Sequence, residues 1–262
     1  MSPGFLSREH FITRIYVTFD DTDTLDCGRG TGKLARWFED ELPDGCAMWG
    51  VVRQQLLVHP DVPYTSHNSA ACVVVDAPSA VLVPEIIERA VRHLEKHAVD
   101  GSDPGLCVAT DESPVIEALK AFGVRATREL LTKADAIAVA KGVHLSAHGG
   151  TSDGIIGAAA GTGLTADGWS GRFIEYGKNH RLRDFPNVVS VGELLAEGMI
   201  VLPVDRNVES AKPDDLVDTR GWLRPCLWGG RPAVPVLRVE PGLWQAIGRS
   251  SDKAVAGASN TK

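Results

Sequence analysis

Four aspartates lie within seven positions of one another, directly after an apolar segment: Asp20, Asp21, Asp23 and Asp26. Carboxylates this close repel one another, so a fold keeps such a cluster when a cation neutralises it. A hard divalent ion such as Mg²⁺ is the usual cation, because it prefers oxygen ligands. We therefore predict that this cluster binds a metal ion. The alternative is an acidic turn that only caps a helix.

A glycine-rich turn follows these acids and contains Gly28 and Gly30. Glycines allow backbone N–H groups to approach an anion at the start of a helix. The hydroxyl of Thr31 and the ammonium group of Lys33 come directly behind them. Metal ligands and phosphate ligands in one loop predict Mg-nucleotide chemistry, since phosphoryl transfer depends mostly on positioning and charge stabilisation.

The glycines of this turn do not match the Walker A pattern of P-loop NTPases. That pattern requires a glycine five residues before the Gly-Lys pair and a Ser or Thr after it. Here Cys27 stands five residues before Gly32, and Leu34 follows Lys33. The spacing disfavours a P-loop and leaves a metal-and-phosphate loop of another kind.

A second glycine-rich segment covers residues 149–164 and contains six glycines. Its pattern predicts a flexible loop that enters a buried, tightly packed helix over 155–160. The N-terminus of such a helix is a place where phosphate can bind. The residues expected to contact phosphate there are Gly150, Thr151, Gly154 and Gly157.

The same loop has two further interpretations. His148 precedes it and could act as a general base or a phosphate ligand, with a structural histidine as the alternative. Ser152 stands in the G-x-S-x-G pattern of a hydrolase nucleophile elbow. In that fold the acid and the histidine of the triad follow the serine, and only His180 does so here. The order disfavours a Ser/His/Asp hydrolase.

Four blocks of the chain, taken in order, resemble the kinase domain of archaeal tRNA(Ile) agmatinylcytidine synthetase. Enzymes of that family use ATP to attach agmatine to an anticodon cytidine. The resemblance covers residues 13–180, and a strand at 173–176 resembles the one that follows in the family. The blocks are Asp-Asp-Thr-Asp-Thr at 20–24 with Gly-Arg-Gly-Thr at 28–31, residues 59–64, Asp-Pro-Gly at 103–105, and residues 150–158.

The resemblance implies roles for individual residues. Asp20, Asp21 and Asp23 would hold Mg-ATP, and Thr22 in the same block would contact the nucleotide. Thr31 aligns with a family threonine that takes part in phosphoryl transfer as an autophosphorylation site. The loop at 150–157 would wrap the phosphates.

The chain also departs from the family. The segment 65–69 lacks the lysine and arginine that the family has there, and Asp153 stands in place of a loop arginine. No zinc ribbon is found, and the chain after 185 is too short for the family's ferredoxin-like and OB domains together.

The elements that must position these residues follow from periodicity. Alternating or continuous apolar runs predict strands, and apolar residues three and four apart predict helices. The loop at 59–69, rich in turn-forming residues, joins the second and third strands directly and favours antiparallel pairing. The expected strands are 11–19, 47–58, 70–75, a turn into a short strand at 102–109, a possible strand at 143–148, 171–175 and 199–204. Residues 188–197 predict a short helix or a strand and turn, 205–219 a loop, and 222–239 one or two interrupted strands. The expected helices are 33–42, 83–98, 113–122, 127–141 and 155–160.

We therefore expect an α/β fold with a mixed, largely antiparallel sheet, packed helices and a small C-terminal satellite region. The expected units are a kinase-like Mg-ATP domain at 11–180, a small α+β region at 186–245 and a disordered tail at 253–262. The composition of 262 residues, 44% hydrophobic and 23% charged, is that of an ordinary globular protein.

Charge and cysteine content narrow the function classes. The net charge is −7, and without a long basic run the chain lacks the electrostatic footprint of a protein that binds nucleic acid unaided. A local basic patch is expected around Arg172, Lys178, His180, Arg181 and Arg183. The chain has five scattered cysteines and no CxxC pair, which fits a reducing compartment. No apolar run is long enough to span a bilayer. We therefore expect a cytoplasmic location.

These observations lead to one expected function and two alternatives. We expect a Mg²⁺- and ATP-dependent phosphotransferase or ATP-activated ligase, acting on a small-molecule or nucleoside acceptor. A catalytically inactive nucleotide-binding regulator or partner subunit is one alternative. A tRNA-modifying enzyme that acts with a partner is the other, and a homo-oligomer fits each of them. The expected catalytic residues are Asp21, Asp23, Thr31, Lys33 and His148.

Overall fold

The structure is a computed structural model that describes residues 12–25, 27–62, 68–177, 181–205 and 207–247. The expectations for Asp26, for Lys178 and His180 of the basic patch, and for the tail at 253–262 concern residues outside these ranges.

The first part of the chain forms one antiparallel sheet in the order β5-β4-β1-β3-β2-β6. Strand β1 lies near the middle, between β3 and β4, and ends at Asp20. The acidic segment therefore begins where a central, buried strand stops. The strands are β1 (Thr13–Asp20), β2 (Ala47–Gln55), β3 (Ser69–Ala77), β4 (Gly105–Thr110), β5 (His144–Ala147) and β6 (Arg172–Tyr176).

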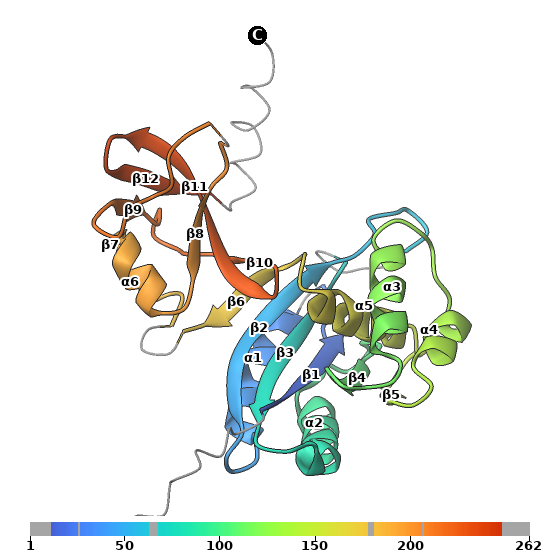
Figure 1. The fold of residues 1–262 in the computed structure, drawn as a ribbon. Coiled ribbons are helices and arrows are strands. Elements are labelled where there is room, and N and C mark those ends of the chain that lie inside the picture. The colour runs from blue at the N-terminus through green and yellow to red at the C-terminus, as the bar shows by residue number, and fades with distance from the viewer. Residues whose placement is uncertain (1–11, 26, 63–67, 178–180, 206, 248–262) are drawn as a thin grey trace, which may run out of the picture.

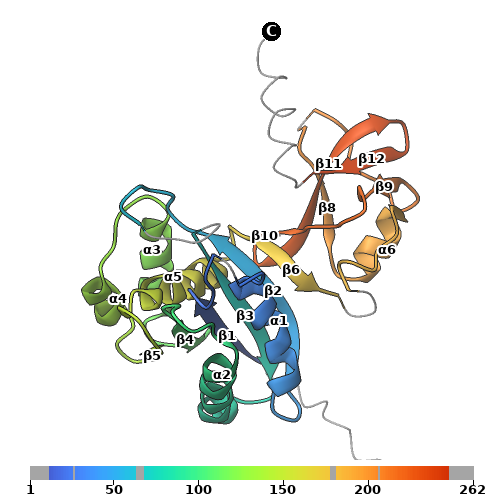
Figure 2. The ribbon, with the colours of Figure 1, turned by 180° about the vertical axis from the view of Figure 1, so that it is seen from behind.

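Helices cover both faces of this sheet (Figures 1 and 2). Because side chains alternate along a strand, β1 sends Ile15, Val17 and Phe19 to the face of α1 and α2, and Tyr16 to the face of α5. The helices are α1 (Thr31–Trp37), α2 (Val83–His97), α3 (Ile116–Ala126), α4 (Lys133–Val139) and α5 (Gly154–Asp167), with short 3₁₀ turns at Phe38–Glu41 and Ala80–Leu82.

The sheet continues into the C-terminal region through β6, in the order β6-β10-β11-β12-β9-β7, with β8 paired to β11. The pairs β8–β11 and β9–β12 are parallel. The described residues thus form a mixed, largely antiparallel open sheet with packed helices, which confirms the expected fold class. The elements are β7 (Val188–Ser190), α6 (Val191–Ala196), β8 (Ile200–Pro203), β9 (Leu216–Asp218), β10 (Cys226–Trp228), β11 (Arg231–Glu240) and β12 (Leu243–Ala246).

Two strands of the C-terminal region, β9 and β12, were not expected from the sequence. Residues 205–219 are polar enough to predict a loop, but Leu216, Val217 and Asp218 pair with β12. A three-residue strand carries too short a pattern to be recognised, and its ladder depends on a partner that comes later in the chain.

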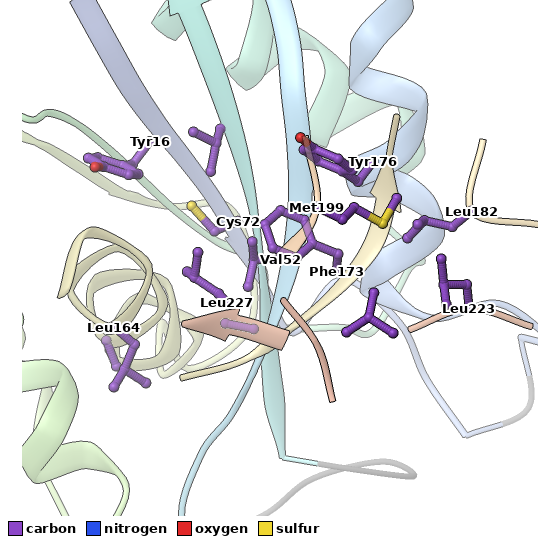
Figure 3. Close-up of a cluster of buried hydrophobic side chains, with 14 of the residues drawn as sticks. Tyr16, Val52, Cys72, Leu164, Phe173, Tyr176, Leu182, Met199, Leu223 and Leu227 are labelled. Carbon is purple, nitrogen blue, oxygen red and sulfur yellow. The ribbon is translucent and has the colours of Figure 1, made fainter. Parts of the chain in front are cut away.

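One hydrophobic core joins the two parts of the molecule. Phe173 and Tyr176 of β6 pack with Trp49 of β2, with ring centroids 5.2 and 5.7 Å from that of Trp49. Figure 3 shows the same cluster reaching Met199 and Leu227 in the C-terminal region. Among the described residues, no helix is both long and apolar enough to cross a membrane.

His93 of α2 is buried, at 2% exposure, and packs against the rings of Phe19 and Phe38, which also contact each other. Its Nε2–H donates to the carbonyl oxygen of Leu34 at 2.9 Å, and its Nδ1 has no partner among the described residues. Burial lowers the pKa of His93, although the bond to Leu34 opposes this, and the neighbouring His97 lowers it further. The ring is therefore neutral in the folded protein near neutral pH.

Replacing His93 with Leu is expected to reduce the loss of stability on acidification. Because the pKa of His93 is lower in the folded chain, the unfolded chain takes up the proton first as pH falls below about 6.5. The free energy of unfolding then falls by at most about 1.4 kcal/mol per pH unit for such a group. Urea unfolding at neutral and at mildly acidic pH measures how much the free energy of unfolding falls between the two. This fall should be smaller in H93L than in the wild type. The same substitution at the half-exposed His59 is the control. A fall in the free energy of unfolding that is as large in H93L as in the wild type would contradict a contribution from His93.

Candidate functional site

A pocket of about 600 Å³ lies at the end of β1. One part of its wall is acidic, and another is apolar and comes from the ends of β2 and α3 and the segment before α4. The acidic residues include Asp20, Asp21, Asp23, Asp103 and Asp153, and the apolar ones include Leu56, Leu57, Leu130, Leu131 and Ile156. The three aspartates expected to bind metal therefore share one pocket.

Asp20 and Asp21 are held in conditions that oppose their charge. Asp20 is 9% exposed, and burial raises its pKa well above the ordinary value; Asp21 and Asp23 add repulsion, although a backbone hydrogen bond from Asp21 opposes the shift. Burial, followed by repulsion from Asp103, Asp23 and Asp153, raises the pKa of Asp21 to about 6. A bound cation would relieve this repulsion, because it favours the charged form of each carboxyl group.

The backbone at Asp21 is itself strained. Its φ of 48° lies in the left-handed region, which a non-glycine residue seldom adopts. Two hydrogen bonds hold the turn: the N–H of Asp103 donates to the carbonyl of Asp21, and the N–H of Val99 donates to that of Thr22. The surrounding fold thus fixes the direction in which the acidic segment leaves the sheet.

Thr31 is the first residue of α1, and its hydroxyl is fixed by three hydrogen bonds. It donates to Asp23 Oδ1 at 3.0 Å, and it accepts from the hydroxyl of Thr22 at 3.1 Å and from the N–H of Thr22 at 3.3 Å. Thr31 is 7% exposed and still lines the pocket. A hydroxyl that donates to a carboxylate is the arrangement needed for a nucleophile with an adjacent base.

The glycine loop before α5 holds a carboxylate that belongs to the protein. The backbone N–H groups of Thr151, Ser152 and Asp153 donate to the Asp103 carboxylate at 3.1, 2.7 and 3.0 Å, and the Thr151 hydroxyl also donates to it. Burial acts to raise the pKa of Asp103, but these hydrogen bonds outweigh it and lower the pKa below its ordinary value. A phosphate at these N–H groups would have to compete with Asp103.

Gly154 and Gly157 of α5 line the pocket and allow the helix to approach the acidic segment closely. A Cβ atom on Gly154 would overlap the carbonyl oxygen of Asp103, and one on Gly157 would overlap the carboxylate of Asp20. Gly150, with φ of 53°, packs against the side chain of Asp103 and does not line the pocket. These glycines therefore position two of the acids.

Lys133 supplies a cation at the rim that the sequence did not indicate. Its Nζ lies 3.2 Å from Asp153 Oδ1 and donates to the carbonyl of Thr151 at 2.6 Å. Lys133 follows Thr132, whose side chain caps α4 in a capping box with Asp135. Asp103 was noticed only as part of an Asp-Pro-Gly block, and nothing local predicted its contacts with the glycine loop.

Other expected residues lie elsewhere. Lys33 and Gly30 line a neighbouring pocket, with Lys33 Nζ 5.2 Å from the Trp37 ring centroid. His148 lines neither pocket; its Nε2 is 2.7 Å from Ser146 Oγ, and its Nδ1 is 3.5 Å from Glu95 Oε1. Gly28, with φ of 66°, lines neither pocket. Thr22 is buried behind Thr31.

Within the described ranges, no group of three or more His, Cys, Asp or Glu side chains is arranged to hold a metal ion. The metal site therefore stays a prediction. Mg²⁺ in nucleotide sites usually takes one or two carboxylates together with phosphate oxygens and waters. The oxygen donors of this pocket fit an ion of that kind better than an ion enclosed by protein ligands alone.

Comparison with solved structures places this fold in one class, that of TiaS, an agmatidine synthetase that acts on an isoleucine tRNA. TiaS in complex with that tRNA, AMPCPP and agmatine matches with a TM-score of 0.51 and 23% identity, over 70% of this chain and 44% of that one. The complex of TiaS with the tRNA and ATP and a tRNA fluorescent labeling enzyme each match with a TM-score of 0.49 and 25% identity, covering 57–58% of this chain and 36% of theirs.

The resemblance inferred from the four sequence blocks is thus confirmed as a likeness of fold to TiaS. The chain covers less than half the length of each of these solved proteins. No family model matches the chain, and no curated protein matches it.

Substituting Asp103 with Asn should loosen the glycine loop. One of the two carboxylate oxygens becomes an amide N–H₂ that faces backbone N–H donors, so part of the hydrogen bonding is lost at a cost of about 1–2 kcal/mol. Hydrogen exchange at the amides of Thr151, Ser152 and Asp153 should become faster, and the melting temperature should fall. The exposed Asp100 gives a matched control as D100N. Unchanged exchange at the three amides would show that Asp103 does not hold the loop.

Proposed function

We propose that this chain is an ATP-dependent phosphotransferase, or a ligase that activates its acceptor by phosphorylation. The observation that carries the proposal is the pairing of Thr31 with Asp23 beside a cluster of mutually repelling carboxylates, in a pocket that also has an apolar wall. A volume of about 600 Å³ lies within the range of ligand pockets. The apolar wall suits a nucleobase, and the acidic part suits metal-bound phosphates.

In this proposal one or two of the carboxylates of Asp20, Asp21 and Asp23 would bind Mg²⁺ together with phosphate oxygens, and the bound ion would neutralise charge on those oxygens. Thr31 is the nucleophile: its hydroxyl passes a proton to Asp23 as Oγ1 bonds to the γ-phosphorus of ATP and the bond to the leaving ADP breaks. The fixed hydrogen bonds from Thr22 keep the Thr31 oxygen in place for this step. The final acceptor is then a hydroxyl or carbonyl oxygen of a small or nucleoside-like molecule.

The likeness of fold to TiaS favours a second candidate function. The TiaS structure that matches with a TM-score of 0.51 is a complex with an isoleucine tRNA, AMPCPP and agmatine, which makes tRNA modification the natural alternative. In this alternative a partner protein supplies further contacts to the RNA. Recovery of tRNA with the purified chain would favour this alternative.

The test measures nucleotide binding and phosphate transfer separately. Asp21→Asn should weaken Mg²⁺-dependent ATP binding at least about tenfold, or about 1.4 kcal/mol, and asparagine tolerates the left-handed backbone at this position. The matched control is Asp111→Asn, because Asp111 is exposed at the opposite end of β4. Thr31→Val should keep ATP binding but abolish labelling of the protein by γ-labelled ATP.

Each outcome separates the candidate functions. ATP binding with neither labelling nor turnover would favour an inactive nucleotide-binding regulator or partner subunit. Absence of Mg²⁺-dependent ATP binding in the wild type would overturn the proposal. Labelling that persists in Thr31→Val would remove Thr31 as the nucleophile.

A further inference from the structure

A second pocket, of about 320 Å³, adjoins the first, and Asp23, Thr31 and Ser69 line both. Its wall comes from α1, β2, β6 and the segment before β10, and Figure 2 shows α1, β2 and β6 next to one another. Six cationic residues line it, against the single carboxylate of Asp23. These six are Lys33, Arg36, Arg53, Arg172, Arg183 and Arg224.

Arg53 of β2 and Arg172 of β6 place two like charges side by side in this wall. They are directly opposite in the ladder between the two strands, and like charges at such positions destabilise a sheet. Burial lowers the pKa of Arg53, and no described carboxylate forms an ion pair with either arginine. An anion between the two guanidinium groups would offset this repulsion.

The described residues use little of the hydrogen-bonding capacity of Arg36, Arg53 and Arg172. A guanidinium group has five N–H donors. Arg53 gives one bond to Ser69 Oγ at 2.9 Å, Arg36 gives one to the carbonyl of Gly32 at 3.3 Å, and Arg172 gives one to that of Arg224 at 3.5 Å. No other hydrogen bond from these three guanidinium groups to a described residue is present, which leaves several donors for water or a ligand.

Trp222 adds an aromatic surface to the wall of this pocket. Its ring stacks with the guanidinium groups of Arg224 at 3.5 Å and Arg183 at 5.0 Å. Its indole Nε1 is buried and has no hydrogen-bond partner among the described residues. Buried polar groups are nearly always bonded, so the Trp222 side chain is incompletely satisfied by the described residues.

We propose that this second pocket binds the anionic group of a small acceptor molecule, a phosphate or a carboxylate, beside the hydroxyl of Thr31. Anion binding follows from the residues of the pocket alone. The role of this pocket as the acceptor site rests on the function proposed above. The shared residues Asp23 and Thr31 join the acidic pocket to the cationic one. A phosphoryl group on Thr31 would therefore border both ligands.

Charge distribution favours a small anion over an RNA strand. Six of the chain's 27 Lys and Arg residues lie in this pocket, but only one of its 34 Asp and Glu residues does. The rest of the chain is therefore more acidic than the net charge of −7 indicates. An extended polyanion would meet that acidic remainder, whereas a small anion within about 320 Å³ would not.

The experiment titrates the purified chain with inorganic phosphate and, separately, with citrate, in the absence of ATP and Mg²⁺. Intrinsic fluorescence should change with saturation, and Trp222→Phe should remove most of that change although five other tryptophans remain of the six. Saturation by phosphate alone assigns a phosphate-bearing acceptor, and saturation by citrate alone assigns a carboxylate-bearing one. Either result supports anion binding in the second pocket.

Two variants and one control identify the cations. Arg53→Met and Arg172→Met should each weaken anion binding at least about tenfold, or about 1.4 kcal/mol, with either one sufficient if the other fails to fold. Arg92→Met, on the exposed face of α2, should leave binding unchanged. Mg²⁺-dependent ATP binding should persist in Arg172→Met, so loss of the second pocket is distinguished from failure of the ATP proposal.

Two results would overturn the proposal. One is the absence of saturable binding of both phosphate and citrate at millimolar concentration. The other is binding of tRNA that depends on Arg53 and Arg172 while the small anions do not bind, which would make this an RNA phosphate site.

Discussion

Repulsion among carboxylates at the end of β1 is the constraint on which the site depends. Asp20 and Asp21 follow one another where a central strand stops, and Asp23 and Asp103 face them. Hydrogen bonds within the protein offset part of this repulsion. Asp103 receives backbone N–H groups and its pKa falls, whereas Asp20 and Asp21 have raised pKa values. The unequal treatment leaves Asp20 and Asp21 as the carboxyl groups that a cation would stabilise most.

Close packing of α5 makes this arrangement possible. Gly154 and Gly157 bring the helix against Asp103 and Asp20, and side chains at these positions would separate the helix from the strand ends. In the same way, Gly163 of α5 lies against the backbone of Leu119 in α3. Glycines that resemble a phosphate loop therefore also serve helix–sheet packing, and the two roles are not distinguishable by residue type.

Thr31 connects two environments of opposite charge. Its hydroxyl is bound by Thr22 and Asp23 on the acidic side, and α1 carries Lys33 and Arg36 toward the cationic side. The strand β6 completes this second wall with Arg172, and the same strand carries the core from the first part of the chain into the C-terminal region (Figure 3). The C-terminal region thus contributes to the neighbourhood of Thr31 through Trp222 and Arg224.

The sequence by itself determined the elements and the types of ligand. Strands such as β1 and helices such as α2 follow from side-chain periodicity, which acts over a few residues. The acidic segment with Thr31 behind it was likewise visible, because its parts are neighbours in the chain. Tertiary structure alone decided that Asp103 occupies the N–H groups of the glycine loop, that Lys33 faces the second pocket and that Arg53 lies opposite Arg172. These contacts depend on strand register and helix packing between residues far apart in sequence, which no local pattern encodes.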